Sequence, residues 1–398
     1  MRPTFPSGRH FLQIPGPSNV PDRVLRAIDQ PTIDHRGPDF AALTRQILAK
    51  LQPVFRTSGE VVIFPASGTG AWEAALVNTL SPGDGVLMFE TGHFATLWAD
   101  LARRLGLEVE LAPGDWRRGV EAGALYDRLA SDVERRFKAV AVVHNETSTG
   151  VTSDVAAVRE ALNRAGHDAL LLVDTISSLG SIDYRHDDWG VDVTVAGSQK
   201  GLMLPPGLSF NAISERAWEA HRRARSPRGY WDWSAMVSAN REGFFPYTPA
   251  TNLLFGLNEA LDMLLEEGLE RVFARHGRHA AATREAARVW GLELQCLNPR
   301  EYSNSLTALR LPPESDADEL RRLILERFDM SLGAGLGRLQ SRVFRIGHLG
   351  MLNDLMLAGT LAGVEMGLKL TGVPHNSGGL QAAMAHLTEA ARGQAAAD

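Results

Sequence analysis

Lys200 is the residue of this chain whose surroundings most favour covalent or acid–base chemistry. A short β-branched run at 191–195 precedes it, and an apolar stretch at 202–206 follows it. An amine held among apolar neighbours has a lowered pKa and becomes a usable nucleophile or base. A loop lysine is more often a solvated surface residue, but only four of the 41 basic residues here are lysine. This chain therefore builds its basic surface from arginine, which favours a chemical role for Lys200.

Asp174 stands at the carboxyl end of a second apolar run, Leu170–Val173. A strand that is apolar throughout is typical of a parallel sheet buried on both faces. Such sheets bind ligands outside the carboxyl ends of their strands. The carboxylate could be a metal ligand, a sugar-binding group or the partner of a protonated ring nitrogen. It could also be a simple turn residue at the end of the strand.

The loop Ser67-Gly68-Thr69-Gly70 lies between an apolar run at 61–64 and a helical pattern. Glycines let the backbone approach an anion, and a helix N-terminus offers free N–H groups and the positive end of its dipole. The Gly-Lys-Ser/Thr sequence of a P-loop is missing. The loop is therefore either a phosphate site or an ordinary helix cap.

These three features predict a cofactor when they are taken together. The carboxyl ends of parallel strands meet at one edge of a sheet, so the lysine, the aspartate and the loop are expected to face one another. They match the needs of pyridoxal 5'-phosphate: an amine for its aldehyde, a carboxylate that keeps its ring nitrogen protonated, and a helix N-terminus for its phosphate.

The elements that position these groups alternate between strands and helices. Seven strands are expected, at 61–64, 85–89, 107–111, 139–143, 170–173, 191–195 and 208–212. Helical patterns fill most of the gaps, at 70–80, 95–105, 122–135 and 155–165. Strands separated by helices predict an α/β fold with a mostly parallel seven-stranded sheet covered on both faces.

The pattern changes after residue 250 and predicts a smaller α+β unit. Helices are expected at 253–267, 270–289, 317–328 and 351–370, and strands at 292–294, 305–310 and 342–346. We expect an extended arm over 1–20, a large cofactor-binding domain over 21–255 and a small domain over 256–398. The last residues, 393–398, are expected to fray.

Three further features are interpreted as structural. The glycine-rich segment 331–337 lacks the spacing of a dinucleotide loop and is expected to form a turn. His276 and His279 have no acidic or cysteine partner in their motif, so they are expected to be solvated. Trp72 and Trp98 are expected to pack helices rather than to stack on a ligand.

Composition excludes several classes of protein. The 398 residues suffice for two domains, and 44% hydrophobic with 22% charged residues is ordinary for a globular protein. A formal charge of −6 gives no basic excess for nucleic acid or an anionic membrane. The single cysteine, Cys296, rules out an intrachain disulfide and multi-cysteine metal sites, so no metal is expected. No signal-peptide or membrane-spanning run is seen, which makes the cytoplasm the expected location.

Four segments resemble one known family. FPASGTGAWEAALVNTLSPGD, HNETSTGV, LLVDTISSLGSID and AGSQKGLMLPPGLSF are similar to class V aminotransferases of fold type I, and more narrowly to the serine–glyoxylate and alanine–glyoxylate group. The resemblance extends from about Pro15 to Leu370. It implies pyridoxal 5'-phosphate, a homodimer, and transfer of an amino group from a small amino acid to glyoxylate.

The resemblance also implies roles for single residues. Lys200 would form the Schiff base and act as general base and then acid, and Asp174 would pair with the ring nitrogen. The other implied cofactor contacts are Ser67, Gly68, Thr69 and Gln199 at the phosphate, Phe94 and Ile176 on the two ring faces, and Thr147 at the phenolic oxygen.

Three residues complete the implied site. Arg345 would bind the substrate carboxylate through two parallel hydrogen bonds, and Gly16 of the arm would line the same pocket. Thr248 would reach the phosphate of the neighbouring subunit. Some relatives carry a tyrosine three residues before that threonine, whereas this chain has Phe245, a departure that bears on the phosphate contact.

The amino donor is left open between several small amino acids. Serine is the first prediction, and aspartate, 3-hydroxyaspartate and alanine are the alternatives. The Asp34-His35-Arg36 segment resembles bacterial members that use serine or aspartate, and Arg36 could bind a second carboxylate or bridge subunits.

Other activities are also weighed. A lyase or aldolase would use the same cofactor. A cysteine desulfurase needs a nucleophilic cysteine on a mobile loop, which Cys296 beside a short strand does not match. A non-enzymatic regulator would carry a basic DNA-binding domain, and no such segment is visible.

Overall fold

The apolar runs between residues 60 and 213 pair into one sheet of seven strands. The structure is a computed structural model that describes residues 8–395. The strand order is β2-β10-β9-β8-β5-β3-β4. Their bounds are β2 (Glu60–Phe64), β3 (Gly85–Phe89), β4 (Glu108–Ala112), β5 (Phe137–Val143), β8 (Leu170–Asp174), β9 (Val193–Gly197) and β10 (Ser209–Ile213). β10 runs antiparallel to β2 and β9, and the other pairs are parallel. The predicted mostly parallel sheet is confirmed, with β9 placed two residues later than expected.

Two layers of helices cover this sheet because successive strand residues point to opposite faces. In β8, Leu171 and Val173 belong to one apolar core, and Leu170 and Leu172 belong to the other. The first core is covered by α2 (Pro38–Phe55), α5 (Ala122–Ser131), α6 (Val155–Arg164) and α9 (Thr251–Glu267). The second is covered by α3 (Gly68–Thr79), α4 (His93–Arg104), α7 (Glu215–Arg223) and α8 (Trp233–Arg241). This arrangement explains why the first four residues of β8, Leu170–Val173, are all apolar.

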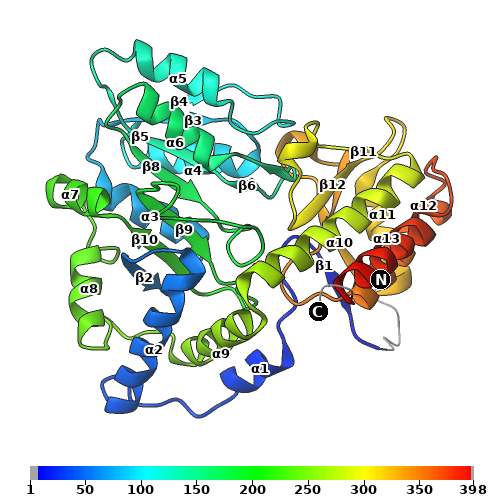
Figure 1. Cartoon of the computed structure of the whole chain (residues 1–398), viewed down its shortest axis with the longest axis horizontal. Coiled ribbons are helices and arrows are strands. Elements are labelled where there is room, and N and C mark those ends of the chain that lie inside the picture. The colour runs from blue at the N-terminus through cyan, green and yellow to red at the C-terminus, as the bar shows by residue number, and fades with distance from the viewer. Residues whose placement is uncertain (1–7, 396–398) are drawn as a thin grey trace.

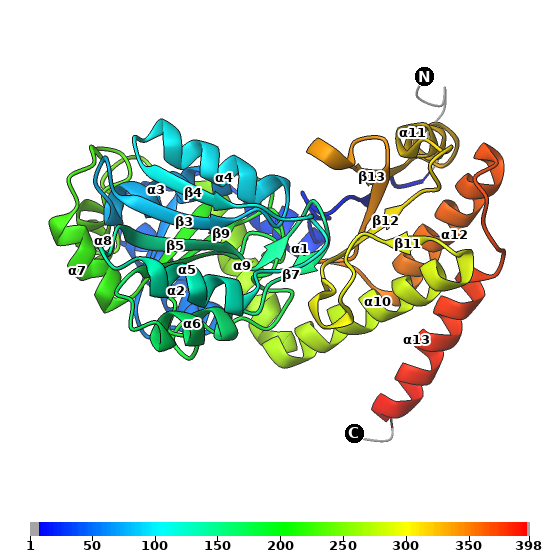
Figure 2. The same ribbon diagram turned by 90° about the horizontal axis from the view of Figure 1, so that it is seen from above.

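A second lobe is built on a five-stranded sheet with the order β1-β13-β14-β12-β11. Its strands are β1 (Phe11–Gln13), β11 (Glu293–Leu294), β12 (Leu306–Arg310), β13 (Met330–Ala334) and β14 (Val343–Gly347). Its helices are α10 (Leu269–Trp290), α11 (Ala317–Phe328), α12 (Asp354–Thr371) and α13 (Gly379–Ala395). The other short elements of the chain are α1 (Asp22–Ile28), β6 (Asn145–Glu146), β7 (Val151–Thr152) and the 3-10 helices η1 (Pro299–Glu301) and η2 (Gly337–Leu339). Figure 2 shows the two lobes side by side.

The N-terminal arm belongs to both lobes. β1 pairs in parallel with β13, so the arm forms an edge of the smaller sheet. A few residues later, the Ser18 backbone N–H donates to Gln199 O at 3.0 Å, and its hydroxyl donates to Lys200 O at 2.9 Å. In Figure 2 this blue segment runs between the lobes. The proposed domain boundary at 255/256 falls inside α9 and stays a prediction.

The glycine-rich segment 331–337 is a strand over its first part, so the prediction of a turn is wrong there. β13 covers Met330–Ala334 and pairs with both β1 and β14. A Cβ atom built on Gly333 would lie 2.7 Å from Pro15 Cδ and 3.0 Å from Arg345 Cβ. Glycine is needed because the arm and β14 approach this strand closely.

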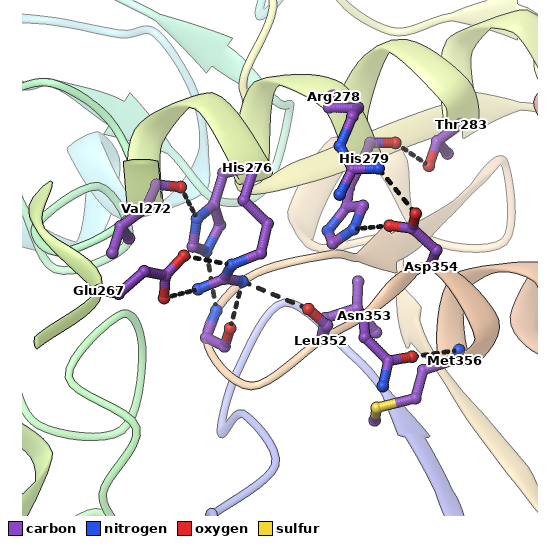
Figure 3. Close-up of polar contacts among 12 residues, drawn as sticks. Glu267, Val272, His276, Arg278, His279, Thr283, Leu352, Asn353, Asp354 and Met356 are labelled. Carbon is purple, nitrogen blue, oxygen red and sulfur yellow. Dashed lines mark hydrogen bonds and ion pairs between the residues drawn. The ribbon is translucent and has the colours of Figure 1, made fainter. Parts of the chain in front are cut away.

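The prediction that His276 and His279 are solvated is also wrong, because both are buried in α10 (Figure 3). His276 Nε2 accepts from the Gly350 N–H at 3.0 Å, so its Nδ1 donates to Val272 O at 2.7 Å. His279 Nε2 lies 2.9 Å from Asp354 Oδ1 at the start of α12. The acidic partner comes from a distant part of the chain, where no local motif could reveal it.

The C-terminal end departs from expectation in two respects. α13 was not predicted, and it runs to Ala395 against α10 (Figure 1). Residues 393–395, expected to fray, are therefore helical. The last three residues of the predicted tail, 396–398, lie outside the described residues.

Candidate active site

The carboxyl edge of the large sheet brings Asp174 and Lys200 together. β8 and β9 are parallel neighbours, with Asp174 opposite Val195. Lys200 follows three residues after the end of β9. Each group alters the pKa of the other through its charge. The predicted pairing at this edge is therefore present in the structure.

Lys200 is buried beneath the N-terminal arm. Its side chain is 8% exposed, and Nζ donates a hydrogen bond to Pro15 O. Burial and, to a lesser extent, the charge of the nearby Arg345 lower the pKa of the amine, Asp174 opposes them, and the result is a pKa of about 7. A Cβ atom on Gly16 would lie 2.3 Å from Lys200 Cδ. Gly16 therefore lies against the end of the lysine side chain, and any larger residue there would displace the lysine and strain its own backbone, which has φ +95°.

Asp174 is a buried carboxylate held by two donors. Oδ1 accepts the Ile176 N–H at 2.7 Å, and Oδ2 accepts the Trp72 indole N–H at 3.0 Å. Burial raises the pKa of Asp174 to about 7, and both hydrogen bonds act against this rise. The Trp72 and Trp98 rings stack at 5.8 Å, so their predicted packing role is confirmed. The bond from Trp72 to Asp174 was not foreseen, because nothing in the sequence aims a helix tryptophan at a strand end.

The Ser67–Gly70 loop opens α3 directly after β2. Ser67 is the N-cap residue, yet its side chain makes no capping hydrogen bond. The Ser67 and Thr69 side chains are exposed, and a Cβ atom on Gly68 would lie 2.2 Å from Ile176 Cδ1. The uncapped helix end and the free hydroxyl suit an anion better than the alternative of a plain cap.

Gln199 adds a polar atom that lacks a partner. Its Oε1 is buried and has no hydrogen bond within the described part of the chain. A buried amide oxygen without a partner is costly, and a ligand would relieve that cost. This unpartnered atom and the uncapped start of α3 fit a phosphate-bearing cofactor bound beside Lys200.

Phe94 is held by a buried carboxylate that sequence reasoning missed, and Thr147 is held by a serine. Glu146 accepts the N–H groups of Phe94 at 3.3 Å and of Ala95 at 3.1 Å, which fixes the first turn of α4. The Thr147 hydroxyl donates to Ser177 Oγ at 2.7 Å. Glu146 belongs to the HNETSTG motif, but the sequence does not show that its carboxylate binds the first turn of α4.

Arg345 comes from the other lobe and faces this edge. It lies in β14, its Nε donates to Ala334 O at 2.7 Å, and its Nη1 donates to Thr147 O at 2.7 Å. Among the residues that the structure describes, none gives Nη2 a hydrogen bond. Burial lowers the pKa of Arg345 to about 10, so the guanidinium stays charged at neutral pH. The free end of this fork can bind a carboxylate.

Comparison with known proteins agrees with this geometry. The sequence pattern of the family described as aminotransferase class-V matches residues 10–311. The chain belongs to the class-V aminotransferase family. It is 46% identical to the serine–glyoxylate aminotransferase of Arabidopsis thaliana over 384 residues, 96% of each chain. It is also 46% identical to the L-aspartate–glyoxylate aminotransferase of Paracoccus denitrificans over 375 residues, 94% of this chain and 95% of that protein.

The fold of this class-V aminotransferase is likewise shared with solved structures. The ureidoglycine–glyoxylate aminotransferase of Bacillus subtilis superimposes with a TM-score of 0.89, at 27% identity, over 96% of this chain and 99% of that one. The chain is a fold type I, pyridoxal 5'-phosphate-dependent aminotransferase, as the sequence predicts. Within residues 8–395, no helix is long and apolar enough to cross a membrane.

Three residues named from the sequence lie apart from this cluster. Thr248 is exposed, and Phe245 packs its ring 6.1 Å from that of Phe40. The Arg36 side chain is also exposed, and its backbone N–H donates to Asp34 Oδ1. The described chain links none of the three by a hydrogen bond to Lys200 or Asp174, so their roles stay predictions.

Cys296 has the wrong environment for a nucleophile in this aminotransferase. It is buried two residues after the end of β11, and burial raises the pKa of its thiol to about 11. A nucleophilic cysteine requires a thiolate near neutral pH. The structure therefore gives no support to a desulfurase.

Proposed function

We propose that this aminotransferase transfers the amino group of L-serine to glyoxylate, giving hydroxypyruvate and glycine. The observation that carries the proposal is the buried amine of Lys200, which has a pKa of about 7 and lies beside Asp174 under the arm. The serine donor is supported by the 46% identical plant relative named for that reaction.

The proposed mechanism gives each residue of the cluster one task. When bound, pyridoxal 5'-phosphate supplies an electron-accepting ring that stabilises the carbanion left after α-proton removal. Lys200 Nζ would take up the α-proton as a base and later release it as an acid, and a pKa near 7 suits an amine with both tasks. Asp174 holds a proton at the ring nitrogen. The Pro15–Gly16 segment keeps water away from the lysine.

We propose that Arg345 orients the substrate. Two of its nitrogens are fixed by the carbonyls of Ala334 and Thr147, so the guanidinium is held before substrate arrives. Nη1 and Nη2 together present the parallel N–H groups that match an α-carboxylate. Both the amino acid and the keto acid carry this group, so one arginine serves both halves of the reaction.

We further propose a homodimer in the cytoplasm in which Thr248 completes the phosphate site of the neighbouring subunit. The exposed side chain of Thr248 supports this, because no hydrogen bond in residues 8–395 joins it to Ser67 or Thr69 of its own chain. Sedimentation velocity tests the assembly. Thr248→Val in an intact dimer is expected to weaken cofactor binding, and unchanged binding would remove Thr248 from the site.

An aspartate or 3-hydroxyaspartate donor is the second candidate. It is favoured by the 46% identical Paracoccus denitrificans relative and by Arg36, whose exposed guanidinium could bind a second carboxylate. In this reading Arg36→Gln would slow reaction with aspartate and leave reaction with serine unchanged.

Half-reactions separate these donors. The cofactor-loaded enzyme is mixed in turn with serine, alanine, aspartate and 3-hydroxyaspartate, and the loss of the cofactor's visible absorbance is followed by stopped flow. Serine is expected to react fastest, with Lys200→Ala as the inactive control. Faster reaction with aspartate would replace serine by the second candidate. Products released repeatedly without any keto acid would indicate a lyase or aldolase instead.

A further inference from the structure

The Asp174 carboxylate is held from the helix that also carries the phosphate loop. Trp72 is the fifth residue of α3, and its indole N–H lies 3.0 Å from Asp174 Oδ2. Both side chains are buried. The element that opens with Ser67 and Gly68 therefore also contacts the carboxylate proposed for the cofactor's ring nitrogen.

The Trp72 ring has little freedom to move. It is stacked on Trp98 of α4, with 5.8 Å between ring centroids and 12° between planes. Trp98 is equally buried, but its own indole N–H has no hydrogen-bond partner in the described chain. Two stacked indoles thus differ in one respect: only Trp72 donates to the carboxylate.

The surroundings of Asp174 set how strongly its ionised form depends on the Trp72 hydrogen bond. Lys200 favours the ionised carboxylate, Glu146 disfavours it, and burial is the largest influence and also disfavours it. The hydrogen bonds from Trp72 and the Ile176 N–H both favour the ionised form. The Ile176 donor is a backbone N–H, which a substitution does not remove. The Trp72 donor is a side-chain N–H, so a substitution at position 72 can remove it.

We propose that Trp72 is a positioning residue whose indole N–H fixes the orientation of the Asp174 carboxylate and keeps it ionised for the cofactor. The inference rests on the proposed role of Asp174. The two stacked tryptophans then have different roles. Trp98 packs against the ring of Trp72, and Trp72 donates the hydrogen bond that holds the aspartate. Loss of the N–H leaves the buried carboxylate with one fewer donor, which favours its protonated form.

Trp72→Phe and Trp98→Phe form a matched pair for the test. Each keeps an aromatic ring in the stack and removes one indole N–H. We expect Trp72→Phe to weaken cofactor binding about tenfold at neutral pH, the scale of one charge-assisted hydrogen bond. The pH below which the bound cofactor's visible absorbance changes is expected to shift upward. Trp98→Phe is expected to match the native enzyme in both readouts.

Asp174→Asn in the same titration separates the two proposals. If Asp174→Asn leaves affinity and absorbance unchanged, the proposed role of Asp174 is wrong. If Asp174→Asn alters them while Trp72→Phe behaves like Trp98→Phe, only the role of Trp72 is overturned. Should Trp72→Phe fail to fold, benzothienylalanine at position 72 removes the N–H and keeps the size of the ring. An unchanged titration with that analogue would likewise overturn the inference.

Discussion

At the scale of single residues, burial moves two opposite groups of the site towards the same pKa. The ordinary pKa of a lysine lies near 10.5 and that of an aspartate near 3.8, yet here both are moved to about 7. Burial disfavours any charge, so it lowers the first and raises the second. Lys200 can therefore act as a base near neutral pH, and Asp174 needs donors to stay ionised.

The charge of Arg345 is expected to lower the pKa of the Lys200 amine. Because the guanidinium lowers the pKa of the amine, Arg345→Gln should raise it, whereas Arg345→Lys should leave it near its native value. The measurement is the pH dependence of cofactor capture by the apoprotein, with no substrate present. Capture by Arg345→Gln should require a higher pH than capture by Arg345→Lys. Equal midpoints would show that the charge of Arg345 does not reach the lysine.

At the scale of elements, local sequence patterns predicted the features that depend on neighbouring residues, such as the strands of the large sheet. Most strands of the large sheet are apolar runs bounded by turn signals. Asp174 ends one of them and Lys200 follows another, so their meeting at one edge could be foreseen. The positions of β1 and β13 could not be foreseen, because their pairing joins distant parts of the chain and the glycines at 333, 335 and 337 resemble those of a turn. The contacts of Glu146 and the bond from Trp72 to Asp174 depend on helix placement, which no spacing rule supplies.

The arm offers a matched test of its role as an element. Gly16→Ala would place a Cβ atom 2.3 to 2.6 Å from three side-chain atoms of Lys200. Gly8 has a similar φ, +88° against +95°, but no atom within 4 Å of its Cβ position. Both substitutions carry the backbone cost of positive φ, and only Gly16→Ala displaces the lysine.

We expect Gly16→Ala to lose the visible absorbance of bound cofactor and at least ~100-fold in kcat, the scale of a catalytic group misplaced by 1 Å. Gly8→Ala should retain both. Retention of absorbance and turnover by Gly16→Ala would mean that the arm does not cover Lys200 in solution.

At the scale of the whole molecule, buried neutral histidines make the stability of the fold depend on pH. Burial lowers the pKa of His144 and of His186 to about 4 and that of His276 to about 3, and it holds the pKa of His348 well below its ordinary value. They lie in both lobes, and His276 joins α10 to the loop that follows β14. Protonation would break contacts throughout the molecule.

The chain is therefore expected to lose stability as pH falls. In the unfolded chain these histidines take up protons below their ordinary pKa of about 6.5, whereas the folded chain resists protonation until near pH 4. Each contributes a loss of ~1.4 kcal/mol per pH unit across that window. The melting temperature between pH 7 and pH 4 measures the loss. His276→Gln should flatten the curve relative to His386→Gln on α13, and equal slopes for the two variants would contradict this account.

The central claim is that Lys200 alone among the four lysines holds the cofactor. Borohydride reduction of the cofactor-loaded enzyme, followed by peptide mass spectrometry, tests it directly. The account predicts a pyridoxyl group on the peptide that contains Lys200 and unmodified peptides for Lys50, Lys138 and Lys369. Stoichiometric label on any of those three, or none on Lys200, would contradict it.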